Sequence, residues 1–217
     1  MMNYSKFCEI LNKHIFEGEK RELLKKIADY PERFIGLFRP SKAGTKILQH
    51  LLQSHEIRFG DALEELIEKI LEDLGYSILP KNITTANGEQ LTLDQFFTDG
   101  KNYYFIEQKI RDDHDSTKKR GQIKNFETKL EELFKRYKSK VIGIMYFIDP
   151  DLVKNKNFYI SELNRLKKYY KVPLYLFYGK ELFEFLKSPK YWEKLLDWLI
   201  QWKESLPEIP EINFDTN

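Results

Sequence analysis

The chain has few of the residues that stabilise secreted proteins or bind zinc. Only one of its 217 residues is a cysteine, Cys8, so no disulfide can form within the chain and nothing favours secretion. The four histidines have no metal-ligand spacing with one another or with Cys8, which argues against a zinc site. The sequence also lacks a Gly-rich phosphate loop, a serine elbow and a dinucleotide-binding fingerprint, so we expect no organic cofactor.

Long apolar runs are missing as well. No stretch approaches the ~20 apolar residues that a membrane span requires, and no N-terminal run resembles a signal peptide. We therefore expect a cytoplasmic protein with no membrane partner. The net charge of +2 argues neither for nor against binding to nucleic acid, but basic residues gather in patches such as Lys118–Arg120 and Arg165–Lys171.

The hydrophobic pattern predicts an α/β fold with a helical N-terminal region. Residues 1–57 are interpreted as a helical appendage, 58–178 as the core, and 179–217 as C-terminal helices and a tail. The expected elements of the core are a helix from about Gly60 to Gly75, a strand at Tyr76–Leu79, strands at about 89–97 and 102–111, a helix at 121–137, a strand at Val141–Ile148, a helix at about 159–170 and a strand at Val172–Tyr178. The three tryptophans near the C-terminus indicate either core packing or a subunit contact.

The segment Leu93–Lys109 is the most informative part of the chain. Asp99-Gly100 favours a tight turn, so the segment is predicted to form a β-hairpin. Side chains alternate along a strand, which places Glu107 and Lys109 on one face, and Asp94 on the preceding strand can approach that face. Two carboxylates make an oxygen site suited to Mg²⁺, and a neighbouring ammonium can hold a water or a phosphate. The pattern therefore indicates metal-assisted hydrolysis of a phosphodiester, although a chain with 32% charged residues can contain it by chance.

The order of elements and this motif resemble the PD-(D/E)xK nuclease superfamily, over about residues 58–178. Asp94 and Glu107-Gln108-Lys109 stand where that family has its motif, although Leu93 replaces the proline before the aspartate. The resemblance implies a restriction-endonuclease-like α-β-β-β-α-β core, a mixed sheet flanked by helices. It also implies that Asp94, Glu107 and the backbone carbonyl of Gln108 hold Mg²⁺, and that Lys109 acts on the attacking water or on the phosphate.

Two further features favour a type II restriction endonuclease within that superfamily. Glu64 borders the apolar face of the helix that opens the core, and family members often place a glutamate from this helix beside the metal. A marginal surface glutamate is the alternative interpretation.

The second feature is the polar segment 111–122 that follows the motif. Its short polar and basic side chains suit base edges and phosphates, so we expect it to be a DNA-binding loop. The predicted contacts are Arg111, His114, Ser116, Thr117, Lys118, Lys119, Arg120 and Gln122. A charged loop with a helix cap before residue 121 is the alternative.

The sequence therefore predicts a Mg²⁺-dependent type II restriction endonuclease that cuts both strands of double-stranded DNA at a short site. The alternatives are a DNA repair or junction-resolving nuclease of the same fold, and a catalytically silent DNA-binding module. The chain contains one such constellation, so cutting both strands in one encounter predicts a homodimer.

Overall fold

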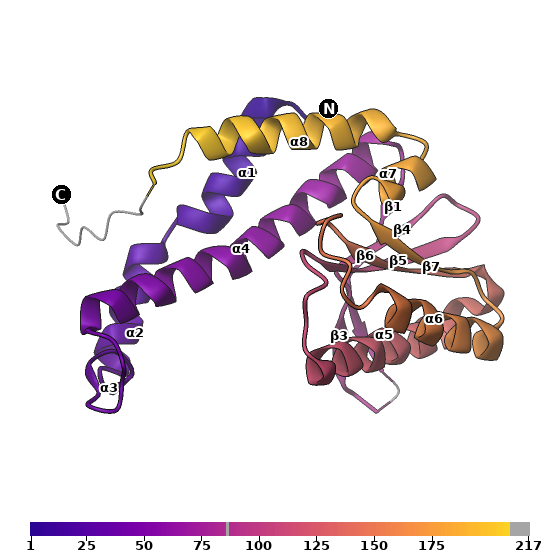
Figure 1. The fold of residues 1–217 in the computed structure, drawn as a ribbon. Helices are drawn as coiled ribbons and strands as arrows, with labels where there is room; N and C mark the ends of the chain where they lie inside the picture. The colour runs from indigo at the N-terminus through magenta and orange to yellow at the C-terminus, as the bar shows by residue number, and fades with distance from the viewer. Residues whose placement is uncertain (86, 209–217) are drawn as a thin grey trace. The chain divides into compact units, whose positions relative to one another are not determined.

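The computed structural model describes residues 1–85 and 87–208, which form two compact units (Figure 1). One unit contains Met1 and Ile67–Leu196, and the other contains Met2–Leu66 and the chain from Asp197 onward. Helices α4 (Ala43–Asp73) and α8 (Pro189–Glu204) each contribute residues to both units. Most of the predicted C-terminal tail lies outside the described residues.

The helical unit is built from α1 (Tyr4–Phe16), α2 (Glu19–Asp29), α3 (Glu32–Ile35) and its shares of α4 and α8. Arg58 of α4 donates hydrogen bonds to the carbonyls of Ile15 and Glu17, both at 3.1 Å. These are carbonyls at the end of α1 that have no partner within the helix, so Arg58 acts as a tertiary C-cap. The ring of Trp202 on α8 lies parallel to the ring of Phe59, and its indole N–H donates a hydrogen bond to Asn12 Oδ1 at 2.9 Å.

Helix α4 corrects the expected start of the core. The hydrophobic pattern assigned residues up to 57 to a helical appendage and began the first core helix at about Gly60, but α4 runs without interruption through residues 55–60. Gly60 costs only about 1 kcal/mol inside a helix. Side chains near Gly60 contact other helices, and the hydrophobic pattern of α4 alone does not reveal these contacts. One example is the ion pair between Arg58 of α4 and Glu22 of α2 at 2.7 Å.

The second unit is organised around a mixed sheet of five strands in the order β1-β4-β5-β6-β7. Strand β5 (Tyr103–Lys109) pairs antiparallel with β4 (Gln95–Thr98), which pairs antiparallel with β1 (Ser77–Ile78). On its other side β5 pairs in parallel with β6 (Val141–Phe147), which pairs in parallel with β7 (Leu174–Tyr178). The helices α5 (Ser116–Tyr137) and α6 (Lys156–Tyr170) connect the parallel strands.

Helices α5 and α6 cover one face of this sheet (Figure 1). Phe105 of β5 points to that face and its ring lies 4.9 Å from the ring of Phe126 on α5. A side chain at Gly143 of β6 would lie 2.7 Å from the Phe105 ring, so glycine is required for this close packing. Glu107 and Lys109 share the face of Phe105, because side chains two residues apart on a strand point the same way.

The hairpin is confirmed, but the strand expected at 89–97 is two strands. Strand β3 (Gln90–Thr92) pairs with β2 (Asn82–Thr84), a strand that the sequence did not predict, in a separate two-stranded sheet. The chain leaves that sheet at Leu93, whose N–H donates to Lys81 at 2.9 Å, and enters the main sheet at β4. Asp94 therefore lies in the break between strands.

The remaining elements agree with the sequence in kind. A short 3₁₀ turn, η1 (Lys138–Lys140), joins α5 to β6, and α7 (Glu181–Phe185) precedes α8. Trp192 and Trp202 are buried within the protomer, which supports the core-packing interpretation for both. No helix of the described residues is long and apolar enough to cross a membrane. The predicted α/β class, with a mixed sheet flanked by helices and an N-terminal helical region, is confirmed.

The turn at Asp99 gives a prediction on acid stability. Its carboxylate accepts the N–H groups of Asn102 and Lys101 and the hydroxyl of Tyr104, and the bond from Asn102 is the main cause that lowers the pKa of Asp99 to about 2. A carboxyl whose pKa is lowered by folding stabilises the protein above about pH 4, and this stabilisation disappears as the pH falls toward 2. The difference in unfolding free energy between wild type and Asp99→Asn should be about 1 kcal/mol at pH 6, small because the turn is exposed.

Denaturant unfolding between pH 6 and pH 2 measures this difference. It should shrink toward zero at the acid end, whereas Asp113→Asn, which changes another exposed aspartate, should track wild type throughout. A difference that is constant across this pH range would contradict the assigned role of the Asp99 carboxylate.

Candidate active site

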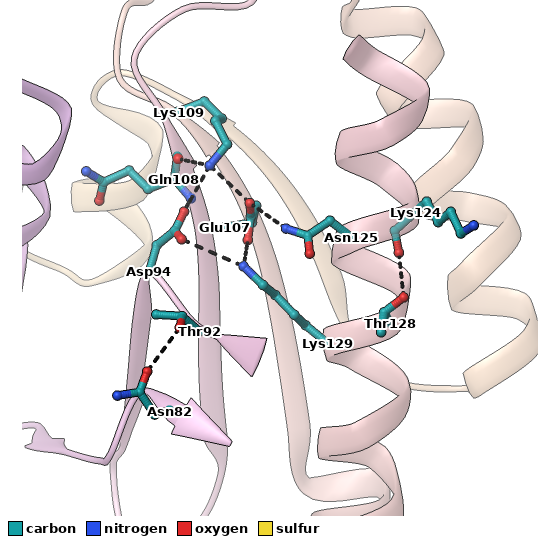
Figure 2. A network of polar contacts seen from close by, with 10 residues as sticks. All are labelled: Asn82, Thr92, Asp94, Glu107, Gln108, Lys109, Lys124, Asn125, Thr128 and Lys129. Carbon is teal, nitrogen blue, oxygen red and sulfur yellow. Dashed lines mark hydrogen bonds and ion pairs between the residues drawn. The ribbon is translucent and has the colours of Figure 1, made fainter. Parts of the chain in front are cut away.

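Two carboxylates meet at the end of β5 (Figure 2). Glu107 is 2% exposed and points toward α5 from the central strand. Asp94 reaches the same place from the break before β4, where its Oδ2 accepts the backbone N–H of Gln108 at 2.7 Å. The break thus allows Asp94 to approach a position that a continuous strand would not give it.

The ammonium of Lys109 lies among three oxygen atoms. Its Nζ is 3.1 Å from Asp94 Oδ2, 3.0 Å from Glu107 Oε1 and 2.7 Å from the carbonyl oxygen of Gln108. Burial by itself lowers the pKa of Lys109, but the negative charges of Glu107 and Asp94 outweigh it and leave the pKa raised. The amine is therefore a cation at neutral pH in this arrangement.

A second ammonium contacts the same carboxylates from α5. Lys129 is 4% exposed, and its Nζ lies 2.5 Å from Glu107 Oε2 and 3.8 Å from Asp94 Oδ1. Asn125, one turn earlier, donates to Glu107 Oε1 at 3.2 Å. Both oxygens of Glu107 are thus paired, as a buried carboxylate requires.

Sequence reasoning missed Lys129 and Asn125, although one signal was available for the lysine. Lys129 stands three residues after Phe126 and four before Leu133, so it shares the buried stripe of α5. A lysine at an apolar position of a helix is rarely buried without a partner. The sequence does not reveal that Glu107 is that partner.

The oxygens at this place fit a hard divalent cation. Two carboxylates and one backbone carbonyl already converge on a single positive charge, the ammonium of Lys109, and oxygen ligands of this kind suit Mg²⁺. Among the described residues no group of three or more His, Cys, Asp or Glu side chains is placed to hold a metal. A metal here would therefore take the rest of its ligands from water or substrate, as Mg²⁺ commonly does.

Glu64 is half-buried on α4 and belongs to the helical unit, whereas Asp94, Glu107 and Lys109 belong to the unit that contains the sheet. Its role beside the metal stays a prediction.

The segment predicted as a DNA-binding loop is largely helical. Helix α5 begins at Ser116 rather than near residue 121, because the Asp115 carboxylate accepts the N–H groups of Thr117 and Lys118 and caps the helix. Gly121 does not interrupt it. Only residues 110–115 connect β5 to α5, so the predicted contacts lie on a short loop and the first turns of a helix.

The predicted DNA contacts differ in their surroundings. Lys119 donates to Asn155 at 3.0 Å and lies over the ring of Phe158, and Gln122 accepts the hydroxyl of Tyr159 at 2.5 Å. His114 is half-buried. The side chains exposed to solvent are Arg111, Ser116, Thr117, Lys118 and Arg120.

The short loop is anchored by Asp112, which is fully buried. Its carboxylate accepts the N–H of Asn155 at 3.0 Å and the hydroxyl of Tyr178 at 2.7 Å, and burial followed by this hydrogen bond raises the pKa of Tyr178. These contacts fix the loop to β7 and to the start of α6. The predicted DNA-facing end of α5 is thereby held at the same edge of the sheet as the carboxylates.

The sequence matches a known protein family over most of its length. The family model described as "Type II restriction endonuclease, HinfI" matches residues 3–84 and 76–203, which together make up most of the chain. The comparison with curated proteins gives no match. Because the family model covers far more than half of the sequence, the chain belongs to the HinfI family of type II restriction endonucleases.

Proposed function

We propose that this protein is a Mg²⁺-dependent endonuclease that hydrolyses phosphodiester bonds in both strands of double-stranded DNA at a short specific sequence. The observation that carries the proposal is the convergence of Asp94, Glu107 and the Gln108 carbonyl on one cation, Lys109 Nζ. Membership of a restriction-endonuclease family supports the same substrate class.

Each residue has a distinct role in this proposal. Asp94, Glu107 and the Gln108 carbonyl would hold Mg²⁺, which when bound acts as a Lewis acid and makes a coordinated water more acidic. Lys109 has to give up its contacts with these oxygens when a metal takes its place. Its flexible four-carbon stem and 30% exposed side chain allow the ammonium to turn toward the phosphate. An ammonium carries a full positive charge and donates hydrogen bonds, so stabilising the charge of the phosphate is the role that fits Lys109 best.

The alternatives from the sequence are less well supported. A silent DNA-binding module has no need to keep two carboxylates and a lysine together in a partly buried site, where unpaired charges are costly. A repair or junction-resolving nuclease would use the same chemistry, so only its products would distinguish it.

Plasmid digestion tests the proposal. Mg²⁺ or Mn²⁺ should give discrete linear fragments, EDTA should abolish cleavage, and Ca²⁺ should allow binding with little cleavage. Asp94→Asn and Glu107→Gln should each lower the cleavage rate at least about a hundredfold, since each removes a metal ligand worth several kcal/mol in the transition state.

The exposed Asp151→Asn variant is the matched control and should cleave like wild type. Circular dichroism of each variant checks the fold. Structure-selective nicks would favour the repair or junction-resolving alternative, and wild-type rates in EDTA would refute the metal mechanism.

We also propose that the exposed basic residues at the start of α5 contact DNA phosphates. Lys118→Ala and Arg120→Ala should each weaken binding to every DNA sequence and reduce the slope of log affinity against log salt by about 0.9, the value for one phosphate that is no longer neutralised. Lys140→Ala, which removes an exposed lysine beyond the far end of α5, should change neither quantity. Fluorescence anisotropy at several salt concentrations measures both, and an unchanged slope in the two α5 variants would exclude this surface.

We propose further that two copies act together on DNA. One catalytic constellation hydrolyses one strand at a time, and a two-fold dimer places a second one on the opposite strand. The helical unit offers a contact surface, an apolar groove of about 710 Å³ lined by residues that include Ile15, Phe59 and Ile200. Ile200 lines this groove and is 60% exposed, so its apolar side chain is accessible to a second copy of the chain.

Sedimentation of the protein with cleavable DNA in Ca²⁺ tests the dimer. Wild type should bind as two protomers, and Ile200→Asp should shift the complex toward one. Ile160→Asp, at another exposed isoleucine on α6, is the matched control. A complex with one protomer that still cuts both strands would contradict the dimer.

A further inference from the structure

Lys129 is a buried charge for which the proposed chemistry gives no role. Its side chain is 5% exposed, compared with 30% for that of Lys109. It extends from a helix face whose neighbouring positions, Phe126 and Leu130, are in the hydrophobic core. Lysine loses side-chain entropy and hydration when it is buried, so its position at 2.5 Å from Glu107 needs an explanation.

The charges at this place sum to zero. Asp94 and Glu107 supply two negative charges, and Lys109 and Lys129 supply two positive charges (Figure 2). A pair of carboxylates alone would attract a divalent cation strongly. With both ammonium groups present, a divalent cation has to enter a site with no net negative charge. Once the cation is bound, the site carries an excess of two positive charges.

The two lysines differ in their freedom to respond. Lys109 is partly exposed and can leave the oxygens, whereas Lys129 is enclosed by α5 and the sheet and has to remain beside Glu107. Its positive charge therefore continues to oppose a bound metal. A DNA phosphate is an anion that would offset part of this excess charge and would also give Lys109 a new partner.

We propose that Lys129 is a positioning residue that holds Glu107 in place and makes binding of the divalent metal depend on DNA. The inference rests on the proposed nuclease function, because it takes the scissile phosphate as the compensating anion. Metal and DNA then bind with positive coupling, and each increases the affinity for the other by the same factor.

Metal binding without DNA separates this role from a merely structural one. Lys129→Met removes the charge and keeps an unbranched chain of similar length. Glu107 retains Lys109 and Asn125 as partners of its Oε1, whereas its Oε2 loses the contact with Lys129. Lys129→Gln also removes the charge but retains a hydrogen-bond donor, which gives a second variant with a buried polar partner for Glu107. Lys124→Met makes the same change at an exposed position five residues earlier and is the matched control.

Titration of each protein with Mn²⁺, followed by the electron paramagnetic resonance of free Mn²⁺, is the first measurement. Without DNA, both Lys129 variants should bind Mn²⁺ at least about tenfold more tightly than wild type, since a like charge beside the metal has been removed. Lys124→Met should match wild type. Equal or weaker Mn²⁺ binding by the Lys129 variants would overturn the proposal and leave Lys129 a structural residue.

The second measurement is the affinity for a plasmid-derived duplex with and without Ca²⁺. Ca²⁺ should increase the affinity of wild type by a large factor. That factor should be at least about tenfold smaller for Lys129→Met, because the variant gains metal affinity mainly in the DNA-free state, and DNA and metal change each other's affinity by the same factor. An equal factor in both proteins would also overturn the coupling.

The outcomes for the two proposals are distinguishable. If wild type cuts no DNA with any metal, the nuclease function fails, and the Mn²⁺ titration without DNA still decides whether Lys129 opposes the metal. If wild type cuts DNA but Lys129→Met binds Mn²⁺ no more tightly, the coupling fails and the nuclease function stands.

Discussion

The buried charge network around Glu107 is the interaction on which the rest of the site depends. Glu107 lies on the central strand of the sheet and faces a helix whose buried side chains are mostly apolar. An ionised carboxylate in such a position is costly unless each of its oxygens is paired. Lys109, Lys129 and Asn125 supply those partners, and they fit only if α5 has its observed register against β5. The contacts that stabilise the buried carboxylate therefore also fix the position of α5 on the sheet.

A second buried carboxylate, that of Asp112, fixes the loop beside the surface that we propose binds DNA. Asp112 follows β5 by three residues and is held by Tyr178 at the end of β7 and by the backbone of Asn155 before α6. Parallel strands bring their carboxyl ends to one edge of a sheet, which is where open α/β proteins commonly bind ligands. The carboxylates and the start of α5 thus belong to one packed unit, and a site supported in this way keeps its geometry better than a site on long loops.

The sequence predicted the parts of this protein that depend on local patterns. Alternation along β5, the Asp99-Gly100 turn and the apolar periodicity of α5 identified the elements and brought Asp94, Glu107 and Lys109 to one place. It could not predict the break at Leu93–Asp94, because the change of sheet depends on the pairing of β3 with β2, a strand that the hydrophobic pattern did not indicate. It also misjudged the start of α5, where the Asp115 cap outweighs Gly121. Lys129 was missed because a buried lysine is explained only by its tertiary partner.

The proposed mechanism links the stability of the site to its chemistry. Two carboxylates held side by side repel each other, and a protein that relied on a metal to relieve this repulsion would be destabilised whenever the metal was absent. Here two ammonium groups relieve it and hold the two carboxylates together. The cost is that the same ammonium groups oppose the metal. A partly exposed lysine can withdraw when substrate arrives, and a buried one cannot. In the proposed mechanism, the different burial of Lys109 and Lys129 therefore distinguishes a residue that moves during the reaction from one that stays in place.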